Sequence, residues 1–278
     1  MHRDGKWARQ LISLQRPDGS WGRFHSMAVS SGDPFTTEQA LSRLLRLGFT
    51  MEDDCIRRAV SYMDDCLSGR REIPDPREKL HNWDIFSALM LSARIRQFTP
   101  DNPAANCVAE QWAGVIEGAF STGAYDHARY IEAYADTFGM KPRGGRLVDF
   151  TSFYQLSLLQ GELSPATESA MMDYVLSKPD GMYYIYDRPL SQPPPFASLA
   201  ASRYMGALEV LAGYRHALSK LGFAAVWLED SRTDGGWDMG RTVRDGAYFP
   251  LSDDWRRPEA RIADCTERVS RLLARLRA

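Results

Sequence analysis

The chain repeats a short phrase in which an apolar helical segment ends in a glycine turn that is followed by an aromatic residue. The clearest copy is residues 11–21, where Pro17 cannot continue a helix and Asp18-Gly19 is a turn pair. Further copies close at positions 71, 125, 183 and 237, so successive closing positions lie 50 to 58 residues apart. Because stacked helical hairpins repeat at such periods, the sequence predicts helical repeats from end to end.

The copies differ in strength. Near the C-terminus, Trp227-Leu228 is followed by Arg232 and then by Asp234-Gly235-Gly236-Trp237, which is the same phrase with Arg in place of Gln15. The turns Gly123-Ala124-Tyr125 and Gly181-Met182-Tyr183 are weaker echoes, and Gly69-Arg70-Arg71 lacks the aromatic residue. We interpret Gln15, Trp21, Arg232 and Trp237 as structural residues, since each indole N–H needs a partner where a helix ends.

The spacing of Leu11, Gln15, Gly19 and Trp21 resembles the QW motif of the squalene–hopene cyclase and protein prenyltransferase superfamily, although Gln10 stands where that family prefers an aromatic residue or leucine. The resemblance implies an all-α fold, an α/α toroid of five to six helical hairpins around a central cavity. It implies one domain over residues 1–278. It places on the inner ring the helices that start near Thr36, Asn82, Leu147, Phe196 and Pro258.

Helical periodicity supports that reading along the chain. Beyond the first helix, it predicts helices over about residues 36–47, 51–67, 82–97, 104–119, 125–138, 147–160, 165–177, 196–214, 215–229 and 258–276. Residues 182–186 are aromatic and compatible with a short extended piece. No convincing sheet is predicted.

Composition bounds the function classes. The chain has 34 basic and 36 acidic residues and a net charge of −2, which argues against a nucleic-acid protein. No run approaches the length of a membrane span, and the N-terminus lacks the apolar core of a secretory signal. The four cysteines do not have the spacing of a disulfide framework, which favours reduced thiols and a cytoplasmic location.

The candidate ligand site consists of residues near the starts of the inner helices and in the loops beside them, because a toroid encloses a concave cavity. Asp84 and Asp149 are the candidate catalytic carboxylates, and each has a plain alternative as a helix-start acid. The candidate ligand-binding residues are His81, Trp83, Phe150, Tyr154, Tyr184, Tyr186, Arg203, Tyr204 and Trp255.

The family's catalytic motifs are not matched. The chain has no DxDD motif, no DDxxD motif, no P-loop and no nucleophile elbow. Asp53-x-Cys55 and Asp64-x-Cys66 have the D-x-C spacing of a prenyltransferase zinc site, but each is expected to place its Asp and Cys on different helix faces. No metal and no cofactor is therefore predicted.

Three functions follow as hypotheses. The first is a prenyltransferase-like or terpenoid-cyclase-like protein that binds an apolar or isoprenoid-like ligand, with its reaction unassigned. The second is a carbohydrate-active α/α barrel that uses paired carboxylates such as Asp84 and Asp149. The third is a non-catalytic scaffold for another protein. Because fold does not give function, the lining of the site has to decide between them.

Overall fold

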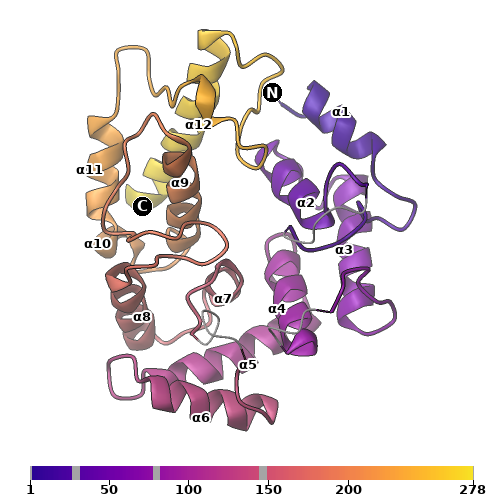
Figure 1. Ribbon diagram of the computed structural model, residues 1–278, viewed down its shortest axis with the longest axis vertical. Coiled ribbons are helices and arrows are strands. Elements are labelled where there is room, and N and C mark those ends of the chain that lie inside the picture. Colours follow the sequence, from indigo (N-terminus) through magenta and orange to yellow (C-terminus); the bar gives the residue numbers. More distant parts are fainter. Residues whose placement is uncertain (1, 27–31, 78–81, 144–148, 278) are drawn as a thin grey trace. The chain divides into compact units, whose positions relative to one another are not determined.

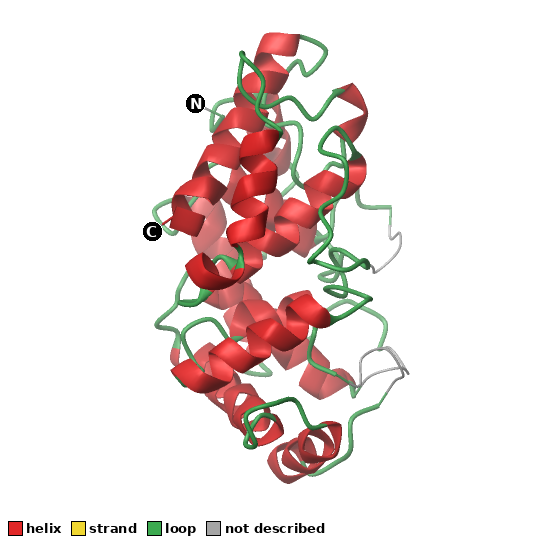
Figure 2. Cartoon of the chain, turned by 90° about the vertical axis from the view of Figure 1, so that its left-hand side faces the viewer, coloured by secondary structure: helices red, strands yellow, loops and turns green. Residues whose placement is uncertain are grey.

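The computed structural model describes residues 2–26, 32–77, 82–143 and 149–277, and this part of the chain is all-α, as predicted. Figure 2 shows helices joined by loops, with no strand among the coloured residues. Contacts divide the chain into two compact units, each described by itself below. No helix in the described ranges has the length and hydropathy needed to cross a bilayer. The toroid and the single-domain organisation stay predictions.

Unit 1 comprises Met1–Ala109 and Leu251–Asp253. Its helices are α1 (Lys6–Ser13), α2 (Thr37–Arg46), α3 (Asp54–Leu67), α4 (Trp83–Arg96) and the first part of α5 (Pro103–Ala119). Thr36 begins α2 with a capping box, because its hydroxyl accepts from Gln39 N while the Gln39 side chain accepts from Thr36 N. α3 packs against both α2 and α4 (Figure 1).

Unit 2 comprises Glu110–Pro250 and Asp254–Ala278. Its helices after α5 are α6 (His127–Phe138), α7 (Phe153–Leu158), α8 (Pro165–Ser177), α9 (Leu199–Leu211), α10 (Ala217–Lys220), α11 (Gly222–Asp230) and α12 (Pro258–Arg277), with a 3₁₀ turn η1 (Arg241–Val243). α5 and α6 lie side by side (Figure 1), and Trp112 packs on Tyr134 at their contact.

The two tryptophan turns are built alike, one in each unit. The indole N–H of Trp21 donates to the carbonyl oxygen of Leu11 at 2.7 Å, and that of Trp237 donates to Leu228 at 2.6 Å. Both rings are buried, with 2% and 4% exposure. Each indole thus gives a second hydrogen bond to a carbonyl near the end of the preceding helix, which also accepts from the backbone at Leu14 or Ser231.

The same two residues also tie each turn to the next helix of the pair. Trp21 N donates to the Thr37 hydroxyl at 3.0 Å, and Trp237 N donates to the Thr266 hydroxyl at 3.1 Å. One aromatic residue therefore connects the end of one helix to a later helix, at the first residue of α2 in one case and within α12 in the other. This arrangement confirms that Trp21 and Trp237 are structural.

Gln15 and Arg232 act differently at their equivalent positions. The Gln15 amide donates to the carbonyls of Gly19 and Cys55, at 3.0 and 2.8 Å, and so joins the turn to the start of α3. The Arg232 guanidinium instead lies over the Trp237 ring at 5.2 Å. Both residues are structural, but by different interactions.

All five repeated turns contain a glycine in the left-handed region, where a side chain is strained. These glycines are Gly19, Gly69, Gly123, Gly181 and Gly236, with φ between 60° and 113°. At the last turn Gly236 takes this conformation and Gly235 does not. The five turns follow α1, α3, α5, α8 and α11, so the sequence repeat corresponds to a repeated local structure.

Two predicted helices differ in the structure. The helix expected over 147–160 is only α7 (Phe153–Leu158) in the described residues, because the Asp149 side chain accepts from Thr151 N and Ser152 has extended backbone just before the helix begins. The helix expected over 215–229 is divided into α10 and α11 at Leu221-Gly222. Elsewhere the observed ends lie within about three residues of the predicted ones.

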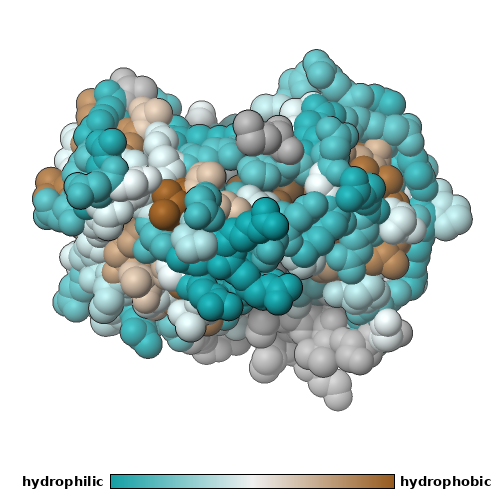
Figure 3. Space-filling model, turned by 90° about the horizontal axis from the view of Figure 1, so that it is seen from above, coloured by the Kyte–Doolittle hydropathy of each residue, from teal (hydrophilic) through white to brown (hydrophobic). Residues whose placement is uncertain are grey.

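The surface seen in Figure 3 is mainly hydrophilic, with hydrophobic residues in small separate patches. In unit 2 the most exposed large apolar side chains are Leu218 at 55% and Val226 at 59%. Scattered apolar residues of this kind are normal on a water-facing surface and need no partner to explain them.

Candidate functional site

The predicted site residues come together best in unit 2, around the loop of residues 182–186. Met182 N donates to Tyr186 O at 2.7 Å and Tyr186 N donates back to Met182 O at 2.9 Å, which closes the loop. Tyr183 N donates to Thr151 O, and Phe153 N donates to Tyr183 O. The loop is therefore held at its base and against the start of α7, and the extended piece considered from the sequence is present as isolated bridges.

Tyr184 lies at the tip of this loop in a strained conformation. Its φ is +74°, and it is the single non-glycine residue with positive φ in the described ranges. Its half-exposed ring meets the Tyr154 ring edge to face at 5.2 Å and lies 4.1 Å from the Tyr183 ring. Such strain costs on the order of 1–3 kcal/mol and is concentrated at functional sites, so Tyr184 is a candidate ligand contact.

A second tyrosine pair, which begins at the end of the same loop, is buried, with Tyr186 at 5% and Tyr204 at 0% exposure. Tyr186 meets Tyr204 of α9 edge to face at 5.2 Å, and Tyr204 meets Trp227 at 5.1 Å. The Tyr204 hydroxyl donates to Leu190 O at 2.8 Å. Burial raises the pKa of both the Tyr186 and the Tyr204 phenols, so they remain neutral. We call Tyr154, Tyr183, Tyr184, Tyr186 and Tyr204 the tyrosine platform, in which Tyr183 and Tyr184 are half-buried and the other three are buried.

Asp149 is connected to this platform through Thr151. One oxygen of its carboxylate accepts from Thr151 N at 2.9 Å and from the Thr151 hydroxyl at 2.6 Å. The other accepts from Lys178 Nζ, and the Tyr174 hydroxyl lies 3.4 Å away. Because Thr151 O in turn accepts from Tyr183 N, Asp149 positions the backbone segment to which the loop is bound. Its side chain is only 15% exposed.

Phe150 and Trp255 are core residues. Phe150 has no exposed surface and packs with Phe120, Tyr125 and Tyr174, an aromatic group in which Tyr125 and Tyr174 stack at 4.2 Å. Trp255 is 2% exposed and stacks on Phe249 at 4.9 Å.

Arg203 is exposed on α9, although its neighbour Tyr204 belongs to the platform. Residues adjacent in a helix point to different faces, which separates the two. The structure therefore pairs the predicted residue Tyr154 with Tyr184 and Tyr186 with Tyr204 through one loop, connects Asp149 to that loop through Thr151, and adds Tyr183.

The predicted site residues of unit 1 form no comparable cluster. Asp84, in the first turn of α4, has a side chain that is 81% exposed and lies 3.9 Å from Arg77. Asn82, not Asp84, caps α4 by accepting from Ile85 N at 3.3 Å. The Trp83 ring lies 6.4 Å from Phe86. His81 falls outside the described residues.

Unit 1 contains a buried acidic centre that the sequence did not reveal. Asp75 is 9% exposed, and its two oxygens accept from Phe24 N at 2.5 Å and His25 N at 2.8 Å. Burial raises the pKa of the Asp75 carboxyl even though these hydrogen bonds oppose the rise. No local spacing connects Asp75 to residues some 50 positions earlier, so the pairing is visible only in three dimensions.

Glu38 lies fully buried in the same unit and is held by a salt bridge. Its carboxylate accepts from Arg94 Nε and Nη2 at 3.0 and 2.8 Å and from Ser26 N at 2.8 Å. Burial alone would raise the pKa of Glu38, but Arg94 and His25 outweigh it and the pKa is lowered. Glu38 is therefore an ionised structural group that joins α2 to α4.

The described residues contain no group of three or more His, Cys, Asp or Glu side chains placed to hold a metal ion. All four cysteines are free, with Cys55 and Cys265 buried. Burial raises the pKa of the Cys66 thiol to about 11 and that of the Cys265 thiol to about 12, so neither is a reactive thiolate.

No family model, no curated protein and no solved structure matches the chain.

Proposed function

We propose that this protein binds an apolar, isoprenoid-like ligand against the tyrosine platform of unit 2. The observation that carries the proposal is the half-exposed pair Tyr183 and Tyr184, which a strained loop holds over Tyr154. Ring faces and edges offer a large apolar contact at low conformational cost. Neutral phenols nearby supply directional hydrogen bonds without charge.

The local fold supports the same proposal. The two tryptophan turns share the indole-to-carbonyl and amide-to-threonine bonds, as expected for repeated hairpins of a QW-motif type. In this proposal the chain is a relative of the terpenoid cyclase and prenyltransferase families with an α/α toroid of hairpins. The proposed function is binding, and any reaction is left unassigned.

The carbohydrate alternative has less support. It requires Asp84 and Asp149 to act as a pair of catalytic carboxylates, one of them as a proton donor. Asp149 is bound by Lys178 and Thr151, which leaves it without a free proton-donating role, while Asp84 is solvent-exposed in unit 1. The catalytic roles of Asp84 and Asp149 stay predictions.

Binding of a dansyl-labelled farnesyl probe tests the proposal, measured by fluorescence anisotropy with the full chain. We expect saturable binding that unlabelled farnesol displaces and malto-oligosaccharides do not. Tyr184→Ala should weaken it at least about tenfold, since losing an aromatic contact and its burial costs roughly 1.5–3 kcal/mol. Tyr154→Phe keeps the ring and tests the hydroxyl alone.

The matched control is Tyr130→Phe, a buried tyrosine of unit 2 whose ring contacts lie outside the platform. It should leave probe affinity unchanged. Displacement by the sugar and not by farnesol would favour the carbohydrate alternative. No binding of either compound by a well-folded chain would contradict the proposal and favour a scaffold.

A further inference from the structure

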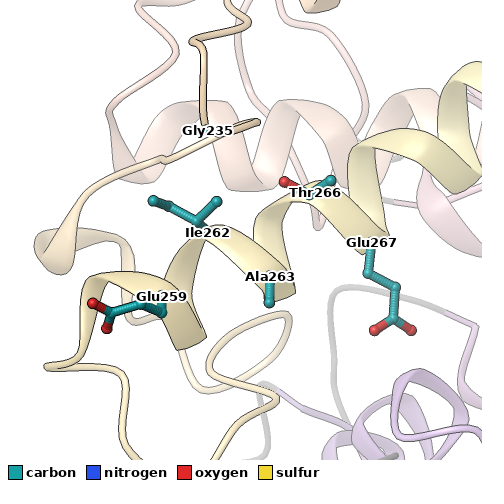
Figure 4. Close-up of a pocket in the computed structure, with 6 residues that line it drawn as sticks. All are labelled: Gly235, Glu259, Ile262, Ala263, Thr266 and Glu267. Carbon is teal, nitrogen blue, oxygen red and sulfur yellow. The ribbon is translucent and has the colours of Figure 1, made fainter.

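A hollow lies along one face of α12 in unit 2. None of the residues that line it belongs to the tyrosine platform. It has a volume of about 620 Å³ and is lined by Gly235, Glu259, Ile262, Ala263, Thr266 and Glu267. Figure 4 shows Glu259 and Glu267 at opposite ends of this stretch of α12, with Ile262 and Thr266 turned toward the Gly235 loop.

The five α12 residues occupy a single helix face, because they follow the i, i+3, i+4, i+7, i+8 spacing. On the buried face of the same helix, Cys265, Val269 and Leu272 pack into the core. On the lined face Ile262 is half-buried and Ala263 is exposed. α12 therefore has a second, partly apolar face along the hollow.

Small residues give a partner close access to the backbone on both sides of this face. Gly235 has no side chain, and a Cβ placed there would meet Ile262 Cδ1 at 3.9 Å, which is ordinary contact. Ala263 presents only a methyl group on the opposite edge. The middle of the hollow is thus apolar and shallow, which suits the apolar stripe of an amphipathic helix.

The two ends of the hollow are acidic. Glu259 is exposed and Glu267 is half-exposed, and Asp234 precedes Gly235 at the edge of the loop. Eight residues of helix separate the two glutamates, which is about 12 Å at 1.5 Å per residue. Arg271 bonds Glu267 at 2.5 Å and partly offsets that end. A complementary partner would place basic residues seven or eight positions apart on either side of an apolar stripe.

We propose that this face of α12 is a docking groove for a basic amphipathic helix of a protein partner. Its apolar centre receives small and medium apolar side chains of the partner, and Glu259 and Glu267 pair with Lys or Arg at the two ends. The proposal does not depend on ligand binding at the tyrosine platform.

The experiment uses the full chain and a fluorescein-labelled helical peptide of about 18 residues. The peptide carries a Leu/Ala stripe flanked by lysines seven residues apart, and a matched peptide carries glutamates in their place. We expect anisotropy to show binding of the lysine peptide only. Raising the ionic strength from about 0.05 to 0.5 M should weaken this binding, because salt screens exposed charge pairs.

Two variants test whether the peptide binds to this face of α12. The double variant Glu259→Gln, Glu267→Gln should weaken binding about three- to tenfold, as expected for two exposed charge pairs. Ala263→Lys should weaken it further by filling the groove with a like charge. The control is Glu132→Gln, Asp136→Asn, which removes two exposed carboxylates from α6 in the same unit.

Equal melting temperatures of these variants and the original chain show that a change in affinity comes from the groove and not from unfolding. The proposal is overturned if the lysine peptide fails to bind at low salt. It is also overturned if the glutamate peptide binds equally well, or if the α12 variants and the α6 control lose the same affinity.

Discussion

The indole nitrogen of Trp21 lies 2.7 Å from the carbonyl oxygen of Leu11, so the ring that fills the turn also closes the end of α1. Trp237 repeats this relationship with Leu228 at the other end of the chain, at 2.6 Å. Each tryptophan thus contributes both a buried ring and a hydrogen bond to a helix carbonyl. The two contributions can be separated by substitution.

Replacing Trp21 or Trp237 by Ala should cost roughly 3–5 kcal/mol in the free energy of unfolding, as for other large-to-small core changes. Replacing either by Phe keeps most of the apolar volume but removes the indole donor, and should cost about 1–3 kcal/mol. Urea denaturation followed by circular dichroism measures both. If the Ala variants unfolded at the same urea concentration as the original chain, these rings would not stabilise the turns.

The repeated glycines differ in how tightly they are enclosed, which gives a matched pair of substitutions. A Cβ at Gly19 would lie 2.3 Å from Arg58 O, whereas one at Gly69 would meet no atom within 4 Å. Both have positive φ, at 92° and 71°. Gly69→Ala should therefore cost only the left-handed strain, about 1 kcal/mol.

Gly19→Ala should cost clearly more than Gly69→Ala, because the α3 backbone would have to move as well. The difference between the two melting temperatures is the measurement. Equal losses would mean that strain alone determines the cost and that the close approach to α3 is unimportant.

Local signals in the sequence were sufficient for much of the fold. Pro17, Asp18 and Gly19 define a turn by their own conformational preferences, and apolar periodicity predicted the helices of both units. The tryptophans were identified as structural because an indole at a helix end needs an acceptor. These inferences succeeded because each rests on residues within about ten positions of one another.

The failures involve contacts between distant residues. The start of α7 was placed too early because Asp149 binds Thr151 and Lys178, and the latter lies 29 positions away. The buried acid Asp75 binds the backbone at Phe24 and His25, which no spacing in the sequence suggests. Candidate aromatic residues could be named, but periodicity could not separate Phe150 in the core from Tyr184 at the loop tip.

Asp149 and Asp84 were predicted to be similar residues, and the structure separates them by environment. Asp149→Ala should lower the free energy of unfolding by about 2–4 kcal/mol, because it removes both Thr151 bonds and leaves the largely buried Lys178 ammonium with only the more distant Asp180 carboxylate, at 3.6 Å. Probe binding should fall too, since Thr151 holds the tyrosine loop. A neutral effect on stability would contradict the positioning role.

Asp84→Ala is the complementary experiment. Its side chain is 81% exposed, so stability should change by less than about 0.5 kcal/mol. Because stability is unaffected, any loss of ligand binding in this variant would be direct evidence for a role of Asp84 in the site. Unchanged binding would remove Asp84 from the list of site residues.

Asp238 should give unit 2 a pH-dependent stability. Hydrogen bonds from Arg261, both 2.6 Å, lower the pKa of the Asp238 carboxyl below its ordinary value of 3.8. A folded-state pKa below the unfolded one contributes stability above pH 3.8, and this contribution is lost as the pH falls through the lowered value. Asp238→Asn should destabilise at pH 7 and reduce the acid-induced loss, as thermal melts between pH 7 and 2.5 would show. If the melting temperature of the variant fell with decreasing pH as steeply as that of the original chain, Asp238 would not be the group responsible.

Tyr184 provides the sharpest test of the tyrosine platform, because its backbone and its ring have opposite effects on stability. Its φ of +74° favours glycine, whereas its ring packs on Tyr154 and Tyr183. Tyr184→Gly and Tyr184→Ala both remove the ring, but only glycine relieves the backbone strain. The glycine variant should therefore be more stable than the alanine variant by about 1 kcal/mol, while both lose affinity for the farnesyl probe equally.

If the alanine variant were as stable as the glycine variant, the strain would be absent. If both variants bound the probe as tightly as the original chain, the Tyr184 ring would not contact the ligand.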